Sequence, residues 1–135
     1  YALIAAGKRH EIIDQYDAYP AMGEIRVNGQ RTRDENLADL AGVEWALDAF
    51  RLSSGAQPEA KRAASPARRF FEAYASVWQR STAPDTATAE AGTSVQAPAK
   101  YRVNGVLANL PEFGKTYACK PGQPMANTVR VTIWR

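Results

Sequence analysis

Residues 31–50, RTRDENLADLAGVEWALDAF, contain two side-chain patterns at the spacing of a helix. Residues three, four and seven apart share one face of a helix. On this rule the large apolar residues form one face: Leu40, Val43, Leu47 and Phe50. An adjacent face, which we call the small-residue face, begins with two acidic residues and continues with small ones: Glu35, Asp39, Gly42 and Ala46. We predict a helix over residues 33–53, ended by Gly55 and Pro58.

The acids of the small-residue face have two interpretations. Small side chains let another helix approach closely, so a carboxylate among them could reach a metal ion held by that helix. Alternatively, Thr32 and Glu35 match the Thr-x-x-Glu capping box, in which the Glu side chain returns to the helix start. The helix dipole also favours acids in a first turn. Capping does not explain Asp39, which lies one turn further in.

Composition narrows the classes of function. The chain has 135 residues, with 45% apolar and 23% charged residues, so it is one folded domain or a piece of a larger one. Its net charge of +3 is spread along the chain, which argues against a nucleic-acid partner. No apolar run approaches the length that spans a membrane. The chain has one Cys, Cys119, and one His, His10, so a metal site would need ligands from another segment or another chain.

The remaining segments predict a mainly α fold with long loops. We expect a helix over residues 2–17, a short hairpin turning at Asn28-Gly29, and a helix that begins at Ser65-Pro66. That helix has an aromatic packing face: Phe70, Phe71, Tyr74, Val77 and Trp78. Residues 81–100 are rich in Ala, Thr, Pro and Gly and are expected to form a loop, followed by a short helix from Pro111. A few helices of this length, joined by long loops, bury a limited core. We therefore predict that the chain is part of a larger domain and not an independent one.

Several segments together resemble one protein family. The octapeptide ENLADLAG, residues 35–42, closely resembles the E-N-x-A-D-x-G-G signature of the neprilysin-like zinc metallopeptidases. Further segments resemble that family in the same order: DQYDAY, RVNGQRTRDEN, FFEAYASVWQR, YRVNGVLANLPEFGKTYACKPGQPMAN and VRVTIW. A collinear match over nearly the whole chain is far more specific than the octapeptide alone.

The resemblance implies a role for three residues. Glu35 occupies the position of the third zinc ligand, and two His of an H-E-x-x-H helix would complete the protein ligands of the single zinc ion. Asp39 is similar in position to an acid that orients one of the zinc-bound His side chains. Arg102, in YRVNG, matches an arginine that helps bind the substrate near the scissile carbonyl group.

Two features depart from the family pattern. The segment HEIID, His10 to Asp14, ends in Asp instead of His, and its flanks match the family's segment after the true motif, so we interpret it as a surface feature of a helix. The family carries D-x-H-x-P in its active-site loop, where the His stabilises the oxyanion. This chain reads SVQAP, with Ser94 and Gln96 at those positions. Gln donates a neutral hydrogen bond only, and losing one oxyanion donor typically costs on the order of a hundredfold in rate.

The resemblance therefore identifies residues 1–135 as the C-terminal part of a gluzincin-type catalytic domain. It implies a zinc-dependent endopeptidase of short peptides, with Asp39, Gln96 and Arg102 at catalytic positions and Glu35 on the metal. The H-E-x-x-H helix would come from the N-terminal portion of the same peptidase or from a separate chain. An extracytoplasmic bacterial setting, periplasmic or secreted, is implied as well. The alternative is a catalytically degenerate relative that serves as a binding or scaffolding module.

Overall fold

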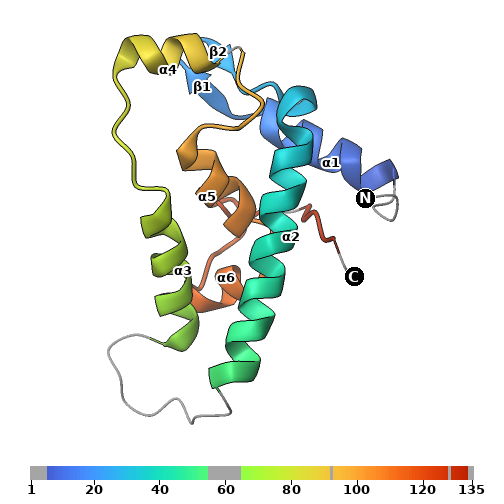
Figure 1. The fold of residues 1–135 in the computed structure, drawn as a ribbon. Helices are drawn as coiled ribbons and strands as arrows, with labels where there is room; N and C mark the ends of the chain where they lie inside the picture. The colour runs from blue at the N-terminus through green and yellow to red at the C-terminus, as the bar shows by residue number, and fades with distance from the viewer. Residues whose placement is uncertain (1–5, 55–64, 92, 128, 134–135) are drawn as a thin grey trace.

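The structure, a computed structural model, describes residues 6–54, 65–91, 93–127 and 129–133 (Figure 1). In these ranges the chain forms α1 (Ala6–Asp17), β1 (Pro20–Met22), β2 (Ile25–Arg26), α2 (Gly29–Ser54), α3 (Pro66–Val77), α4 (Pro84–Ala91), α5 (Ala99–Leu107) and α6 (Pro111–Thr116). The long helix α2 runs through the molecule, with α1 packed across its N-terminal half and α3, α5 and α6 along its length (Figure 1). The predicted mainly α fold is confirmed.

The hairpin does not turn where we predicted. β1 and β2 are antiparallel and turn at Gly23, whose φ of +53° favours glycine. Asn28 and Gly29 instead begin α2. The Asn28 side-chain oxygen accepts a hydrogen bond from the backbone N–H of Arg31 at 2.9 Å, and Asp17 accepts one from the N–H of Gly29 at 2.6 Å. Both contacts stabilise N–H groups that a helix start leaves without a partner. These residues therefore begin a helix and do not form the hairpin turn.

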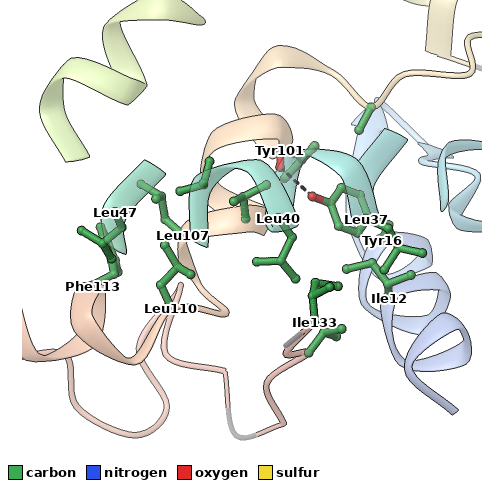
Figure 2. Packing of buried hydrophobic residues seen from close by; sticks show 14 of the residues in the cluster. Ile12, Tyr16, Leu37, Leu40, Leu47, Tyr101, Leu107, Leu110, Phe113 and Ile133 are labelled. Atoms are coloured by element: carbon green, nitrogen blue, oxygen red, sulfur yellow. Dashed lines mark hydrogen bonds between the residues drawn. The ribbon is translucent and has the colours of Figure 1, made fainter. Parts of the chain in front are cut away.

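The core forms where the apolar face of α2 meets α1, α5, α6 and the C-terminal tail (Figure 2). Leu40, Val43 and Leu47 of the predicted apolar face are buried, and Leu37 joins them, while Phe50 is half-buried. On α1, Ile12 and Tyr16 are buried against this face. Tyr16 also donates a hydrogen bond through Oη to the carbonyl oxygen of Tyr101, at 3.1 Å, which joins α1 to α5.

The aromatic helix α3 begins as predicted, because the Ser65 hydroxyl accepts a hydrogen bond from the N–H of Arg68 at 3.2 Å. Phe71 is buried and meets Phe113 of α6 edge to face, with ring centroids 5.4 Å apart. The predicted packing face does not include Val77, whose side chain is 72% exposed. α3 therefore contacts the core with one edge only.

Residues 81–100 are not one loop. They contain α4, which begins at Pro84, and the first residues of α5, which begins at Ala99. Pro is favourable in the first turn of a helix, and the Ala residues of PDTATAEA are strong helix formers. The side chains of α4 are nearly all exposed, so no apolar periodicity marked this helix in the sequence.

The buried side-chain amide of Asn109 joins the tail to the core. Asn109, fully buried, donates through Nδ2 to the side-chain oxygen of Gln15 at 2.8 Å and to the carbonyl oxygen of Gly105 at 3.0 Å. Its Oδ1 accepts a hydrogen bond from the N–H of Val131 at 3.0 Å. Val131 and Ile133 of the tail are both buried, although these residues form no strand.

Gly105 permits the close approach of α5 to α1, which gives a testable prediction. A Cβ at this position would lie 2.6 Å from Oη and 2.8 Å from Cζ of the buried Tyr16 ring. We expect Gly105→Ala to lower the free energy of unfolding by about 1–3 kcal/mol, because a packed core absorbs an extra methyl group poorly. The thermal unfolding midpoint would fall accordingly. Gly114→Ala is the control, since its Cβ would meet only the end of a flexible Arg130 side chain at 3.4 Å. Equal midpoints for the two variants would contradict the prediction.

Candidate active site

Glu35 does not cap the helix. Because α2 begins at Gly29, Thr32 lies inside its first turn and donates through Oγ1 to the carbonyl oxygen of Asn28 at 3.0 Å. Thr32 also accepts a hydrogen bond from the Asn36 amide at 2.9 Å, so its hydroxyl bonds within the helix and does not cap a helix start. The capping-box interpretation is wrong. Within the described part of the chain no group donates a hydrogen bond to the half-buried Glu35 carboxylate, which is available as a ligand.

Asp39 and Arg102 form a bidentate ion pair between α2 and α5. The Nε and Nη2 atoms of Arg102 donate to the two carboxylate oxygens of Asp39, each at 2.6 Å. The two side chains are 14% and 11% exposed, respectively. The hydrogen bonds to Asp39 raise the pKa of Arg102, and the charge of Glu35 adds to the effect. Among the residues that the structure describes, none accepts a hydrogen bond from the Nη1 atom of Arg102.

Two residues of the aromatic segment hold Arg102 from the α3 side. The Trp78 ring lies over the guanidinium, with its centroid 4.0 Å from Cζ. Tyr74 donates a hydrogen bond through Oη to the carbonyl oxygen of Arg102 at 2.8 Å. Burial, with a smaller effect from the charge of Asp39, raises the pKa of Tyr74 to about 12, so its phenol stays protonated as the donor. The sequence predicted both residues as core and gave no signal that they would contact Arg102.

An apolar groove of about 430 Å³ lies between α2 and α3 beside this ion pair. It is lined by Asp39, Gly42 and Ala46 from the small-residue face and by Phe70, Tyr74 and Val77 from α3. A Cβ added to Gly42 would meet no atom within 4 Å. The small-residue face therefore has room for another element of structure, as the sequence pattern predicted.

Gln96 lies in a different, polar hollow. Its exposed side chain lines this hollow with Thr32, Arg80 and Glu90, and its backbone N–H donates to the Ser94 hydroxyl at 3.0 Å. The Gln96 side chain makes no hydrogen bond with Asp39 or Arg102. Of the four site residues predicted from the sequence, the structure brings two into contact and places Glu35 one helical turn from them.

The described residues contain no cluster of three or more His, Cys, Asp or Glu side chains able to hold a metal ion. His10, Glu11 and Asp14 are exposed on α1, which confirms the surface interpretation of HEIID. Glu35 fits a single ligand position, because its carboxylate has no ion-pair or hydrogen-bond partner among the described residues and lies on the face that continues into the open groove. A zinc ion at this place would need its other protein ligands from outside these residues.

Comparison with known proteins gives concordant matches in sequence and in structure. The profile of Peptidase family M13 matches residues 5–133. The chain is 35% identical over 130 residues to Neprilysin-1 of Caenorhabditis elegans, covering 91% of this chain and 17% of that protein. It is 39% identical over 112 residues to Membrane metallo-endopeptidase-like 1 of Mus musculus, covering 80% of this chain and 15% of that protein. The cryo-EM structure of the Mycobacterium tuberculosis zinc metalloprotease Zmp1 in its open state superimposes with a TM-score of 0.85 at 28% identity, covering 96% of this chain and 22% of that chain.

Proposed function

This chain belongs to Peptidase family M13, and we propose that residues 1–135 are the C-terminal part of the catalytic domain of a zinc-dependent endopeptidase acting on short peptides. The chain spans only 17% of Neprilysin-1 and 22% of Zmp1, so the activity belongs to the complete peptidase that contains it. The observation that carries the proposal is the Glu35 carboxylate, which has no partner in the part of the chain that the structure describes and lies one helical turn from Asp39 of the Asp39–Arg102 ion pair.

In the complete peptidase Glu35 would hold the zinc ion together with two His of an H-E-x-x-H helix. When bound, zinc polarises the scissile carbonyl group and lowers the pKa of a water molecule. Asp39 accepts hydrogen bonds from Arg102 on both oxygens and, as a carboxylate, has further lone pairs for the imidazole N–H of a zinc-bound His. Arg102 keeps its Nη1 donors for a carbonyl oxygen of the substrate, while the pair with Asp39 fixes its direction.

The partner of this half-site would be the N-terminal portion of the same peptidase. One side of α2 is exposed and apolar or small along its length: Ala38, Gly42, Trp45, Ala46, Ala49 and Leu52. Exposed apolar faces of this length are typical of surfaces that another element covers. Glu35 lies at the N-terminal end of the same face, so a helix docked there would bring its side chains to the carboxylate.

The proposal is tested on the complete peptidase by metal analysis and a peptide-cleavage assay. We expect one zinc ion per molecule and cleavage of short peptides that a chelator abolishes. Zinc without cleavage would support the second candidate, a degenerate relative that binds without catalysis. That candidate is favoured by one observation, the neutral Gln96 at the position of the family's oxyanion-stabilising His. Absence of zinc would exclude the proposed metal site.

Replacement of Gln96 by His is expected to raise kcat/KM by about tenfold or more, because an imidazolium stabilises an oxyanion better than a neutral amide. The gain should vanish as pH rises through the imidazole pKa, near 6.5 for a free His side chain. Gln96→Asn is the control, since it shortens the side chain and adds no charge. Steady-state rates measured from about pH 5 to about pH 9, on both sides of this pKa, would show both effects. A gain that is the same at every pH would contradict the electrostatic explanation.

We propose an extracytoplasmic location, periplasmic or secreted, for the complete peptidase. The proposal rests on the family alone, whose relatives include a protein named as a membrane metallo-endopeptidase. Among the described residues, no helix has the length and apolar character needed to cross a bilayer. Fractionation of the source cells, with detection of the peptidase in each fraction, would test this location.

A further inference from the structure

Three elements meet at the guanidinium group of Arg102. The side chain itself extends from α5, the carboxylate of Asp39 on α2 accepts hydrogen bonds from its Nε and Nη2 atoms, and its Cζ atom lies over the indole ring of Trp78, 4.0 Å from the centroid. The Arg102 side chain is 11% exposed, so water has little access to replace either contact. Arg102 is thus held by two contacts of different kinds, the hydrogen bonds to Asp39 at one edge and the ring contact with Trp78 at Cζ.

The two contacts constrain different motions. A bidentate carboxylate fixes the direction in which the guanidinium points, because two parallel hydrogen bonds define a line between the groups. Rotation of the guanidinium plane about that line is restrained less strongly. A ring stacked on the face of the guanidinium opposes this rotation, and Trp is the best aromatic partner of a cation. The Nη1 donors change their aim when the plane rotates, so the ring contact matters for whatever Nη1 binds.

Trp78 is held in place by its own surroundings. It is the C-cap residue of α3, and its backbone N–H donates to the carbonyl oxygen of Ala75 at 3.2 Å. Its indole N–H is buried without a well-formed hydrogen bond, although it lies close enough to the Tyr74 oxygen to oppose slightly the rise in pKa of that phenol. The contact with Arg102 involves the face of the indole ring and is independent of the indole N–H.

We propose that Trp78 is a positioning residue that fixes the tilt of the Arg102 guanidinium and so aims its Nη1 donors at the substrate oxygen. The inference rests on the proposed peptidase function. Trp78 acts through Arg102 and touches no reacting atom. Its removal should therefore reduce catalysis only while Arg102 is present, whereas a residue that bound substrate by itself would act independently.

A double-mutant cycle in the complete peptidase tests the proposal. We expect Trp78→Leu to lower kcat/KM by about 5- to 30-fold, the range of a largely desolvated cation–π contact. Trp78→Phe, which keeps an aromatic face, should lose about threefold or less. In an Arg102→Gln background, Trp78→Leu should have no further effect. Gln79→Ala, an exposed neighbour, serves as the control, and thermal midpoints monitor folding of every variant.

Losses that multiply in the double variant would overturn the proposal, as would a Trp78→Leu enzyme within about twofold of the parent. Equal losses in the Leu and Phe variants would also overturn it. If the parent cleaves no peptide, the proposed function fails, and crystal structures of the parent and of Trp78→Leu still decide the positioning. An Arg102 guanidinium that keeps the same plane without the indole would overturn it, and a rotated plane would support it.

Discussion

Replacement of Glu35 by Gln in the complete peptidase is expected to remove the zinc ion and to lower kcat/KM for peptide cleavage by more than about 100-fold. Replacing a residue that only orients a metal ligand typically costs about 10- to 100-fold, so a larger loss indicates a direct ligand. A neutral amide oxygen binds zinc far more weakly than a carboxylate does, and zinc in proteins is held by N, S and carboxylate ligands. Metal content by mass spectrometry and kcat/KM for a short peptide measure the two effects.

The control for Glu35→Gln is the neighbouring acid. Asp34 is exposed and pairs with Arg33 at the surface, with Nε and Oδ1 2.8 Å apart, so Asp34→Asn removes one negative charge without touching the small-residue face. We expect its zinc content and cleavage to match those of the parent. A Glu35→Gln enzyme that keeps one zinc ion per molecule would show that this carboxylate is not a ligand, and the proposed site would then be wrong.

Replacement of Asn109 by Leu is expected to lower the stability of the region around the tail by about 2–4 kcal/mol, because two polar groups lose their hydrogen-bond partner. The groups left without a hydrogen bond would be the N–H of Val131 and the side-chain oxygen of Gln15. The carbonyl oxygen of Gly105 would keep the hydrogen bond that it accepts from Nε2 of Gln15 at 2.8 Å. Each buried, unsatisfied polar group costs about 1–3 kcal/mol, and Leu fills a similar volume, so the effect comes from polarity and not from a cavity.

Hydrogen exchange of the Val131 amide measures the effect of Asn109→Leu directly, because its protection depends on the Asn109 oxygen. We expect faster exchange there and a lower thermal midpoint. Asn127→Ala is the matched control, since the Asn127 side chain reaches the same oxygen only at 3.4 Å and should contribute little. Unchanged exchange at Val131 in the Leu variant would show that the Asn109 oxygen does not protect this amide.

Local patterns predicted the local structure well. The apolar face of α2 and the Ser65 cap are confirmed, because periodicity and capping depend on residues within a few positions of each other. The predictions failed where two local signals competed. Asn28-Gly29 fits a hairpin turn as well as a helix start. The hydrogen bonds that Asp17 and Asn28 accept from N–H groups of α2 stabilise the helix start. The same earlier start of α2 removed Thr32 from the cap position.

The sequence by itself determined the family, the mainly α fold and the helix that carries Glu35 and Asp39, because these depend on short-range spacing and on a collinear motif. Only the tertiary structure decided that Asp39 pairs with Arg102, 63 residues away, and that Trp78 covers the same guanidinium. Helix periodicity places a side chain on a face, but the partner of that face depends on how α2, α3 and α5 pack. Burial then makes the pairing necessary, because a charge removed from water requires an opposite charge within hydrogen-bonding distance.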